Sequence, residues 1–99
     1  MIAIEIQDEH GGRIEEFSDP GAIYLLAGSE AVRCTACLRF IDPYGDTTFN
    51  QYQLSVLIDE CVERLAHLEG AERVRAERLV SFLRQGVGRV HTYVKFIGD

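Results

Sequence analysis

The stretch "FNQYQLSVLIDECVERLAHLEG", Phe49 to Gly70, decides how the rest of the chain is organised. Asn50 is a residue type that caps helix N-termini, and Gln53 can bond back to it in the capping-box arrangement. Phe49 and Leu54 occupy the two positions of a hydrophobic staple around the same cap. Three local signals therefore predict that a helix begins at Asn50.

Apolar side chains recur at helical spacing after this start, at Leu54, Leu57, Ile58, Cys61, Leu65 and Leu68. Burying one large aliphatic side chain is worth roughly 1.5–3 kcal/mol, so this stripe needs a core to pack against. Glu69-Gly70 ends the helix, and a second apolar stripe predicts another helix up to residue 86. Because the connection is short, residues 51–86 are predicted to form an antiparallel helical hairpin.

The segments around the hairpin alternate apolar and polar residues with the period of two that is typical of strands. A short helix is predicted at 20–27. Strands are predicted at about residues 2–6, 13–17, 31–41, 46–49 and 89–97. The last strand, in which Val90, Val94 and Phe96 face the core, is predicted to pair with 31–41. The fold class is α+β: a single domain over residues 1–99, with a four- or five-stranded, mainly antiparallel sheet and the helical hairpin on one face.

Composition narrows the class of protein. A chain of 99 residues that is 46% hydrophobic can bury one core and no more. The first residues form neither a signal peptide nor a transmembrane segment, and an odd count of three cysteines is unusual for a disulfide-stapled domain. These features predict a small acidic protein of the cytoplasm.

Charge and motifs exclude several functions. The net charge of −6 opposes binding to nucleic acid phosphates, and the absence of a long apolar segment opposes a membrane partner. The acids gather in the first 30 residues and the bases in residues 73–99. No nucleotide-binding loop is present, and Cys34 and Cys37 are predicted to point to opposite faces of a strand. No cofactor and no metal are therefore expected.

Two surfaces are candidates for a protein partner. If 31–41 pairs with the last strand, one sheet face presents an aromatic centre with a cationic rim, which suits an acidic partner. Its members would be Arg33, Thr35, Arg39, His91, Tyr93 and Lys95. The simpler interpretation is a solvated face on which the basic residues pair with acids across strands. The polar side of the first long helix carries Asp59, Glu60 and Glu63, which could meet a basic protein.

A polar turn is the alternative site. "DPYGD" has the residues of a type I turn, which already explains Asp42. Asp46 and Asn50 follow it, and the three oxygen-bearing side chains could form a polar site. Together with His91 and Tyr93, Asp42 and Asp46 could serve a small enzyme or a ligand-binding protein.

The leading functional prediction is a non-catalytic protein-binding module, acting as an inhibitor, an immunity-like protein or an adaptor. The general profile, a short acidic α+β domain without a catalytic motif, is similar to bacterial toxin-immunity proteins and small adaptors. A homodimer formed through the open sheet face or an edge strand is a further possibility. The alternative is the small enzyme or ligand-binding protein described above.

Overall fold

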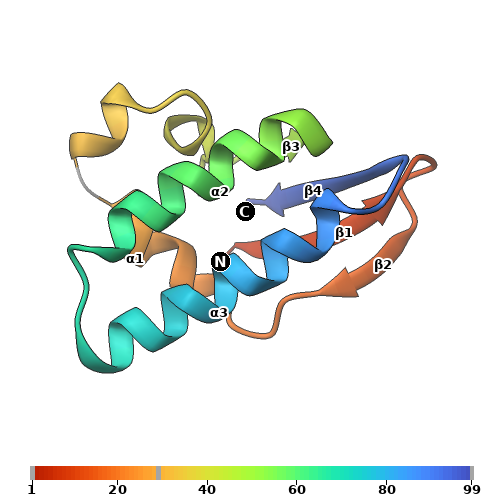
Figure 1. Ribbon diagram of the computed structural model, residues 1–99. Helices are drawn as coiled ribbons and strands as arrows, with labels where there is room; N and C mark the ends of the chain where they lie inside the picture. The colour runs from red at the N-terminus through yellow and green to blue at the C-terminus, as the bar shows by residue number, and fades with distance from the viewer. Residues whose placement is uncertain (1, 29, 99) are drawn as a thin grey trace.

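The computed structural model describes residues 2–28 and 30–98 and confirms the α+β architecture. Its two long helices, α2 (Gln51–Leu65) and α3 (Gly70–Val87), form an antiparallel hairpin that packs on one face of an antiparallel sheet (Figure 1). The strands are β1 (Ala3–Asp8), β2 (Arg13–Glu16), β3 (Thr47–Phe49) and β4 (Thr92–Ile97). The short helices are η1 (Pro20–Ala22), α1 (Ile23–Ala27), η2 (Glu30–Cys34) and η3 (Leu38–Phe40).

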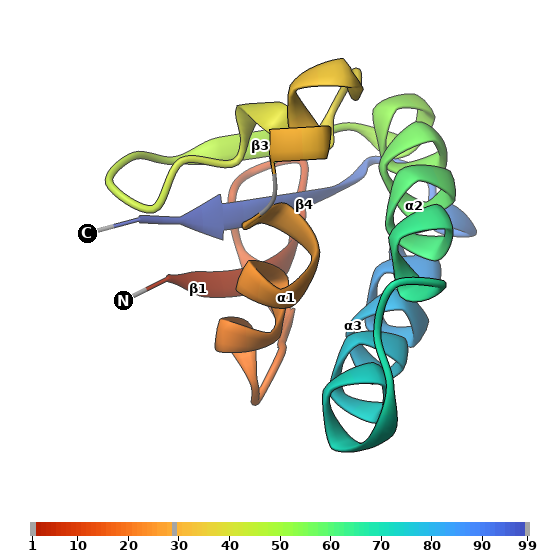
Figure 2. The same cartoon turned by 90° about the vertical axis from the view of Figure 1, so that its left-hand side faces the viewer.

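The sheet has the order β2-β1-β4-β3, so the first and last strands form its central pair. In this pair Ile4 lies opposite Phe96 and Ile6 opposite Val94, and all four side chains are fully buried. Phe49 of β3 meets the Phe96 ring edge-on, with 5.9 Å between the ring centroids. In Figure 2, α2 and α3 stand together at one side of the sheet, and α1 contacts both of these helices. The core fills the space between these helices and the inner sheet face.

The start of α2 follows the capping prediction. The Asn50 side chain accepts hydrogen bonds from the backbone N–H groups of Tyr52 (3.0 Å) and Gln53 (2.9 Å), and the Gln53 side chain accepts one from Asn50 N–H (3.0 Å). Phe49 and Leu54, the staple residues, are both buried. Three otherwise unpaired backbone N–H groups at the helix start are thereby satisfied, which fixes where α2 begins.

The strand predicted at 31–41 is wrong. This segment forms the two short 3-10 helices η2 and η3. The backbone N–H groups of residues 36, 37 and 38 are bound by the Glu60 carboxylate, and the N–H of Arg39 is bound by the Thr35 hydroxyl. Because side chains take these amides, no neighbouring strand is needed to satisfy them. The predicted pairing of 31–41 with the last strand fails for the same reason, and β4 pairs with β1 and β3 instead.

An ion pair ties η1 to α3. The Arg75 guanidinium donates two hydrogen bonds to the Asp19 carboxylate, Nε to Oδ2 at 2.7 Å and Nη2 to Oδ1 at 2.9 Å. These hydrogen bonds hold the pKa of the Asp19 carboxyl below its ordinary value. The forked geometry fixes the direction in which the chain leaves the hairpin of β1 and β2.

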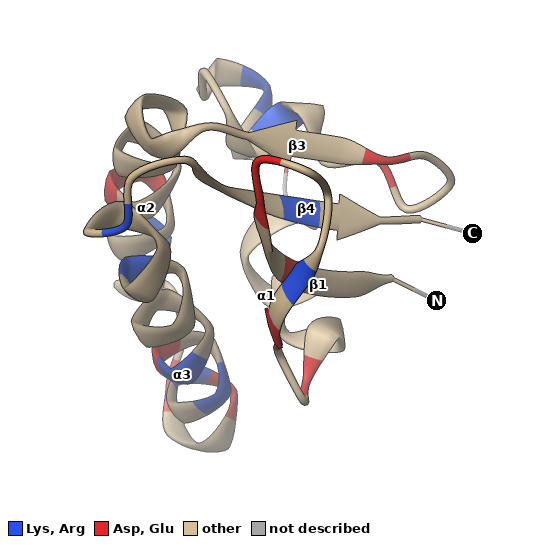
Figure 3. Ribbon diagram, turned by 90° about the vertical axis from the view of Figure 1, so that its right-hand side faces the viewer, with Lys and Arg blue, Asp and Glu red and all other residues tan. Residues whose placement is uncertain are grey.

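The outer face of the sheet is not covered by α1, α2 or α3, and Figure 3 looks onto it. The central pair contributes six partly exposed side chains to this face: Ala3, Glu5, Gln7, Tyr93, Lys95 and Ile97. Arg13 of β2 lies 3.7 Å from Glu5, and the Lys95 ammonium lies 3.5 Å from the Asp46 carboxylate. Charges on this face are thus partly neutralised within the chain.

Candidate functional site

The structure divides the predicted cationic face into two separate parts. Tyr93 and Lys95 lie on the outer sheet face as expected, and His91 directly precedes β4. Arg33, Thr35 and Arg39 lie on or between η2 and η3, which are not strands of the sheet. Arg33 is 3.8 Å from Glu30, and the Arg39 guanidinium stacks 4.7 Å from the centre of the Phe40 ring. The six residues do not form one surface.

Glu60, the central residue of the predicted acidic face of α2, is not available to a partner. Asp59 and Glu63 are exposed on the helix, as a partner-binding surface would require. Glu60 is partly buried, and its carboxylate accepts backbone hydrogen bonds from Ala36 (2.5 Å), Cys37 (3.0 Å) and Leu38 (3.0 Å). Glu60 therefore organises the segment that crosses α2, and two separate carboxylates remain on the surface.

The polar residues Asp42, Asp46 and Asn50 have structural partners. Asp42 accepts a hydrogen bond from Tyr44 N–H (2.8 Å), Asp46 accepts one from Gly98 N–H (3.2 Å), and Asn50 caps α2. Thr47 pairs with Phe96, so Asp42 and Asp46 lie near the C-terminal end of β4 and His91 lies at its other end. At a strand rise of about 3.3 Å per residue these ends are roughly 20 Å apart. The residues of the enzyme alternative therefore do not converge.

The structure brings together a different group at the start of β4. Asn50, Gln51, Tyr52, Val90, His91, Thr92 and Tyr93 line a hollow of about 260 Å³. Tyr52 is 77% exposed and Val90 is 71% exposed, which is unusual for such large side chains in one place. We call Tyr52, Val90, His91 and Tyr93 the tyrosine patch.

Two local features hold the tyrosine patch in shape. His91 has a φ of 60°, in the left-handed region that residues with a side chain rarely adopt. The buried Thr92 hydroxyl donates to the carbonyl oxygen of Arg89 (2.7 Å), with the carbonyl oxygen of Gly86 at 3.1 Å as a second acceptor for the same proton, and locks the turn between α3 and β4. The turn at His91 also turns Val90 outward, so its predicted place in the core is wrong.

Charged side chains of both signs lie next to the patch. His91 Nδ1 lies 3.6 Å from a carboxylate oxygen of Glu9, and Lys95 lies two residues beyond Tyr93 on the same strand face. Arg89, next to Val90 in the turn, has no ion pair among the described residues. The rim of the patch therefore carries positive charge at Arg89, whereas His91 and Lys95 face the carboxylates of Glu9 and Asp46.

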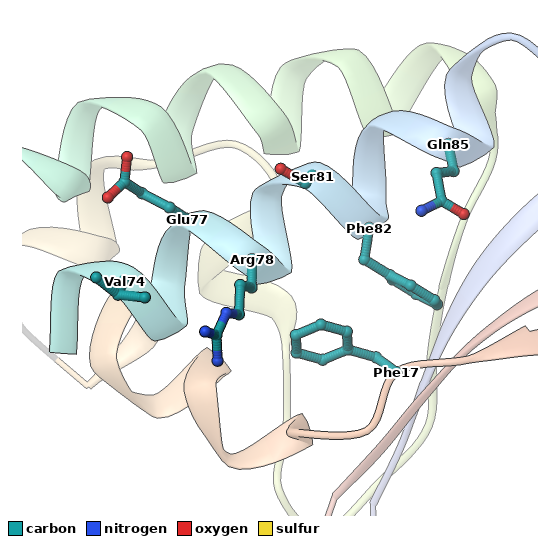
Figure 4. A pocket seen from close by; sticks show the side chains of 7 residues that line it. All are labelled: Phe17, Val74, Glu77, Arg78, Ser81, Phe82 and Gln85. Atoms are coloured by element: carbon teal, nitrogen blue, oxygen red, sulfur yellow. The ribbon is translucent and has the colours of Figure 1, made fainter. Parts of the chain in front are cut away.

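A second hollow, of about 470 Å³, lies between α3 and the residues that follow β2 (Figure 4). Its floor is the aromatic pair Phe17 and Phe82, whose ring centroids are 5.1 Å apart and which are both nearly buried. Arg78 and Gln85 stand on its rim, from α3. Because its deepest residues belong to the core, we interpret this hollow as the packing seam between the sheet and α3.

The three cysteines are free thiols in different surroundings. Burial raises the pKa of the Cys61 thiol to about 12, and the charge of Glu60 adds to the effect. Burial also raises the pKa of the Cys37 thiol, whereas Cys34 is exposed. A thiolate is the reactive form, so buried thiols react slowly. We expect the folded protein to release one equivalent of chromophore rapidly from an aromatic disulfide reagent.

The Cys34→Ser variant provides the control for this assignment. It should lose the fast phase in native buffer and still react at its two remaining thiols in denaturant. Two or more fast equivalents from the folded wild-type protein would contradict the burial of Cys37 and Cys61.

Other site types find no support in the described residues. Within 2–28 and 30–98, no group of three or more His, Cys, Asp or Glu side chains is placed to hold a metal ion. Over the same residues, none of the helices has the length and apolar character needed to cross a bilayer. No family model, curated protein or solved structure matches this chain, so a function must be inferred from its own surface.

Proposed function

We propose that this protein is a non-catalytic protein-binding module that captures an acidic surface of another protein through the tyrosine patch. The observation that carries the proposal is the exposure of Tyr52 and Val90 around one hollow, beside His91 and Tyr93. Tyrosine is enriched among the residues that dominate binding energy, and large exposed apolar side chains in one patch are typical of interaction sites.

The rigidity of the patch supports this role. Tyr52 lies in the first turn of a capped helix, and Val90 lies in a turn locked by the Thr92 hydroxyl. Side chains on such fixed backbone lose little conformational freedom when a partner binds, so more of the contact energy appears as affinity. An inhibitor, an immunity-like protein or an adaptor would each use a surface of this kind.

The charge of the rim favours an acidic partner. Arg89, next to Val90 in the turn, has no ion pair among the described residues, and His91 lines the hollow as a hydrogen-bonding group. Complementary charge speeds association and makes it sensitive to salt. The basic-partner alternative has weaker support, because Glu60 is committed to backbone amides and leaves only Asp59 and Glu63 exposed.

The test is affinity capture from lysate with three baits: wild type, Tyr52→Ser and Tyr44→Ser. Tyr44 is the matched control, since it is 82% exposed but lies in the turn at the far end of β4. The captured protein is then purified and titrated against each bait. We expect an acidic, salt-sensitive partner that binds Tyr52→Ser at least about 30-fold more weakly, the size of a hot-spot residue, and Tyr44→Ser as well as wild type.

Three results would overturn the proposal. The first is a partner that binds the Tyr52→Ser bait and the wild type equally well. The second is a patch-dependent partner that is basic or indifferent to salt. The third is a wild-type dimer, seen by light scattering, that Tyr52→Ser converts to a monomer, because the patch would then serve self-association.

A further inference from the structure

A third hollow lies at the other end of α2, where the segment around η2 crosses the helix. It measures about 330 Å³. Cys34 and Thr35 form one wall, and Glu60, Glu63, Arg64 and His67 contribute from α2 and the turn after it. None of these residues belongs to the tyrosine patch, so this site is independent of the proposed function.

Arg64 in this hollow lacks the partner that its position would normally provide. It stands four residues after Glu60 on the same helix, a spacing at which Glu and Arg usually pair. The Glu60 oxygens are already bound by the backbone N–H groups of residues 36–38. Among the described residues, the Arg64 side chain has no ion pair and no hydrogen bond, and only its backbone is hydrogen-bonded.

The environment of Arg64 makes this lack costly. The Arg64 side chain as a whole is partly buried. Its Nε atom is fully shielded from solvent and has no hydrogen-bond partner among the described residues. A guanidinium always carries its charge and offers five N–H donors, and a buried donor without an acceptor is unfavourable. An acceptor supplied from outside the chain would remove that cost.

The chemistry of the hollow selects the kind of acceptor. A carboxylate matches the planar fork of Arg with two parallel hydrogen bonds, and His67, three residues further along, can supply another donor. Glu60 and Glu63 also line the hollow, and their charges would repel a doubly charged phosphate more than a single carboxylate. We propose that this hollow binds a carboxylate group, held by the Arg64 guanidinium with His67 as a second donor.

The carboxylate could belong to a small molecule or to the end of a peptide. The probes are sodium acetate, a short N-acetylated peptide with a free C-terminus, and the same peptide amidated. Each is titrated into the ¹⁵N-labelled protein at constant ionic strength, with sodium chloride as the reference. We expect acetate to shift the amide signals of Thr35, Glu63 and His67 saturably. If the free peptide binds more tightly than acetate and the amidated peptide does not bind, the ligand is the carboxylate of a peptide. If acetate and the free peptide bind with equal affinity, the ligand is a small carboxylate.

Substitution of the arginine tests the geometry. Arg64→Gln should weaken carboxylate binding at least about tenfold, as expected for loss of a charged, forked hydrogen bond. Arg64→Lys keeps the positive charge but loses the forked pair of donors, so its affinity for the carboxylate should lie between those of wild type and Arg64→Gln. Arg33→Gln on η2, an exposed arginine outside the hollow, is the matched control and should bind as wild type does.

Two results would overturn the proposal: acetate shifts that never saturate, or the same saturable shifts in Arg64→Gln. Either would mean that Arg64 only packs its aliphatic stem along α2. The amide spectrum of Arg64→Gln, recorded without ligand, shows whether the variant is folded. If that variant does not fold, the comparison of Arg64→Lys with wild type carries the test, and equal affinities then count against the proposal.

Discussion

Replacing Glu60 with alanine is expected to lower the free energy of unfolding by about 2–4 kcal/mol, because three backbone N–H groups lose a charged acceptor at once. Those amides belong to residues 36–38, which fold over α2 without a neighbouring strand. Leu38 and Cys37 lie buried beneath them, so a loosened segment would also expose part of the core. Urea unfolding followed by circular dichroism measures the change.

The control for Glu60→Ala is Glu63→Ala, which removes the same charge from an exposed position on α2. Surface substitutions of this kind usually change stability by no more than about 0.5 kcal/mol. Amide signals of residues 36–38 should move in Glu60→Ala and stay in place in Glu63→Ala. Equal stability of the two variants would contradict the role assigned to Glu60.

Replacing Phe96 with alanine is expected to cost about 3–5 kcal/mol, the range for a buried aromatic side chain. Phe96 is fully buried at the centre of the sheet, opposite Ile4 and edge-on to Phe49. Domains of this size are stable by only about 5–15 kcal/mol, so Phe96→Ala should unfold at much lower urea concentration or not fold at all. The midpoint of urea unfolding gives the measurement.

The control for Phe96→Ala is its neighbour, Ile97→Ala, on the outer face of the same strand. Ile97 is partly exposed, so its truncation should cost clearly less. Phe96→Leu keeps most of the volume and remains measurable if the alanine variant does not fold. If Ile97→Ala were as destabilising as the Phe96 substitutions, the two sheet faces would have been assigned the wrong way round.

The local signals of the sequence predict the helical hairpin and the positions of the four strands, but not the order in which the strands pair. The cap at Asn50 depends on contacts within three residues, so it can be read without knowing the rest of the fold. The hairpin of β1 and β2 has the same property, because Gly11 takes the positive φ of its turn.

The segment 31–41 could not be read in this way. Its alternation of apolar and polar residues matches a strand, but the acceptor of its amides is Glu60, more than 20 positions further along the chain. A glutamate in the middle of a helix looks like an ordinary solvated charge until the crossing segment is placed. The error came from a contact distant in sequence, which local periodicity does not report.

The tyrosine patch was found only in part. The sequence predicts His91 and Tyr93 as partner-binding residues but gives no such signal for Tyr52 or Val90, and its alternation predicts Val90 inside the core. The backbone turn at His91 places Val90 outside the strand. Because His91 has a positive φ, the alternation of buried and exposed residues in β4 starts only at Thr92. A glycine at this position would indicate a turn with positive φ, whereas a histidine gives no such signal in the sequence.

The central pair of strands has a consequence for how the protein is made. Ala3 lies opposite Ile97, so the two strands at the heart of the sheet come from opposite ends of the sequence, as Figure 2 shows. During synthesis, β1 emerges first and cannot pair with β4 until the last residues of β4 have been synthesised. Closing so long a loop is entropically costly and slows folding. Until then Ile4 and Ile6, which are fully buried in the folded protein, lack the strand that covers them.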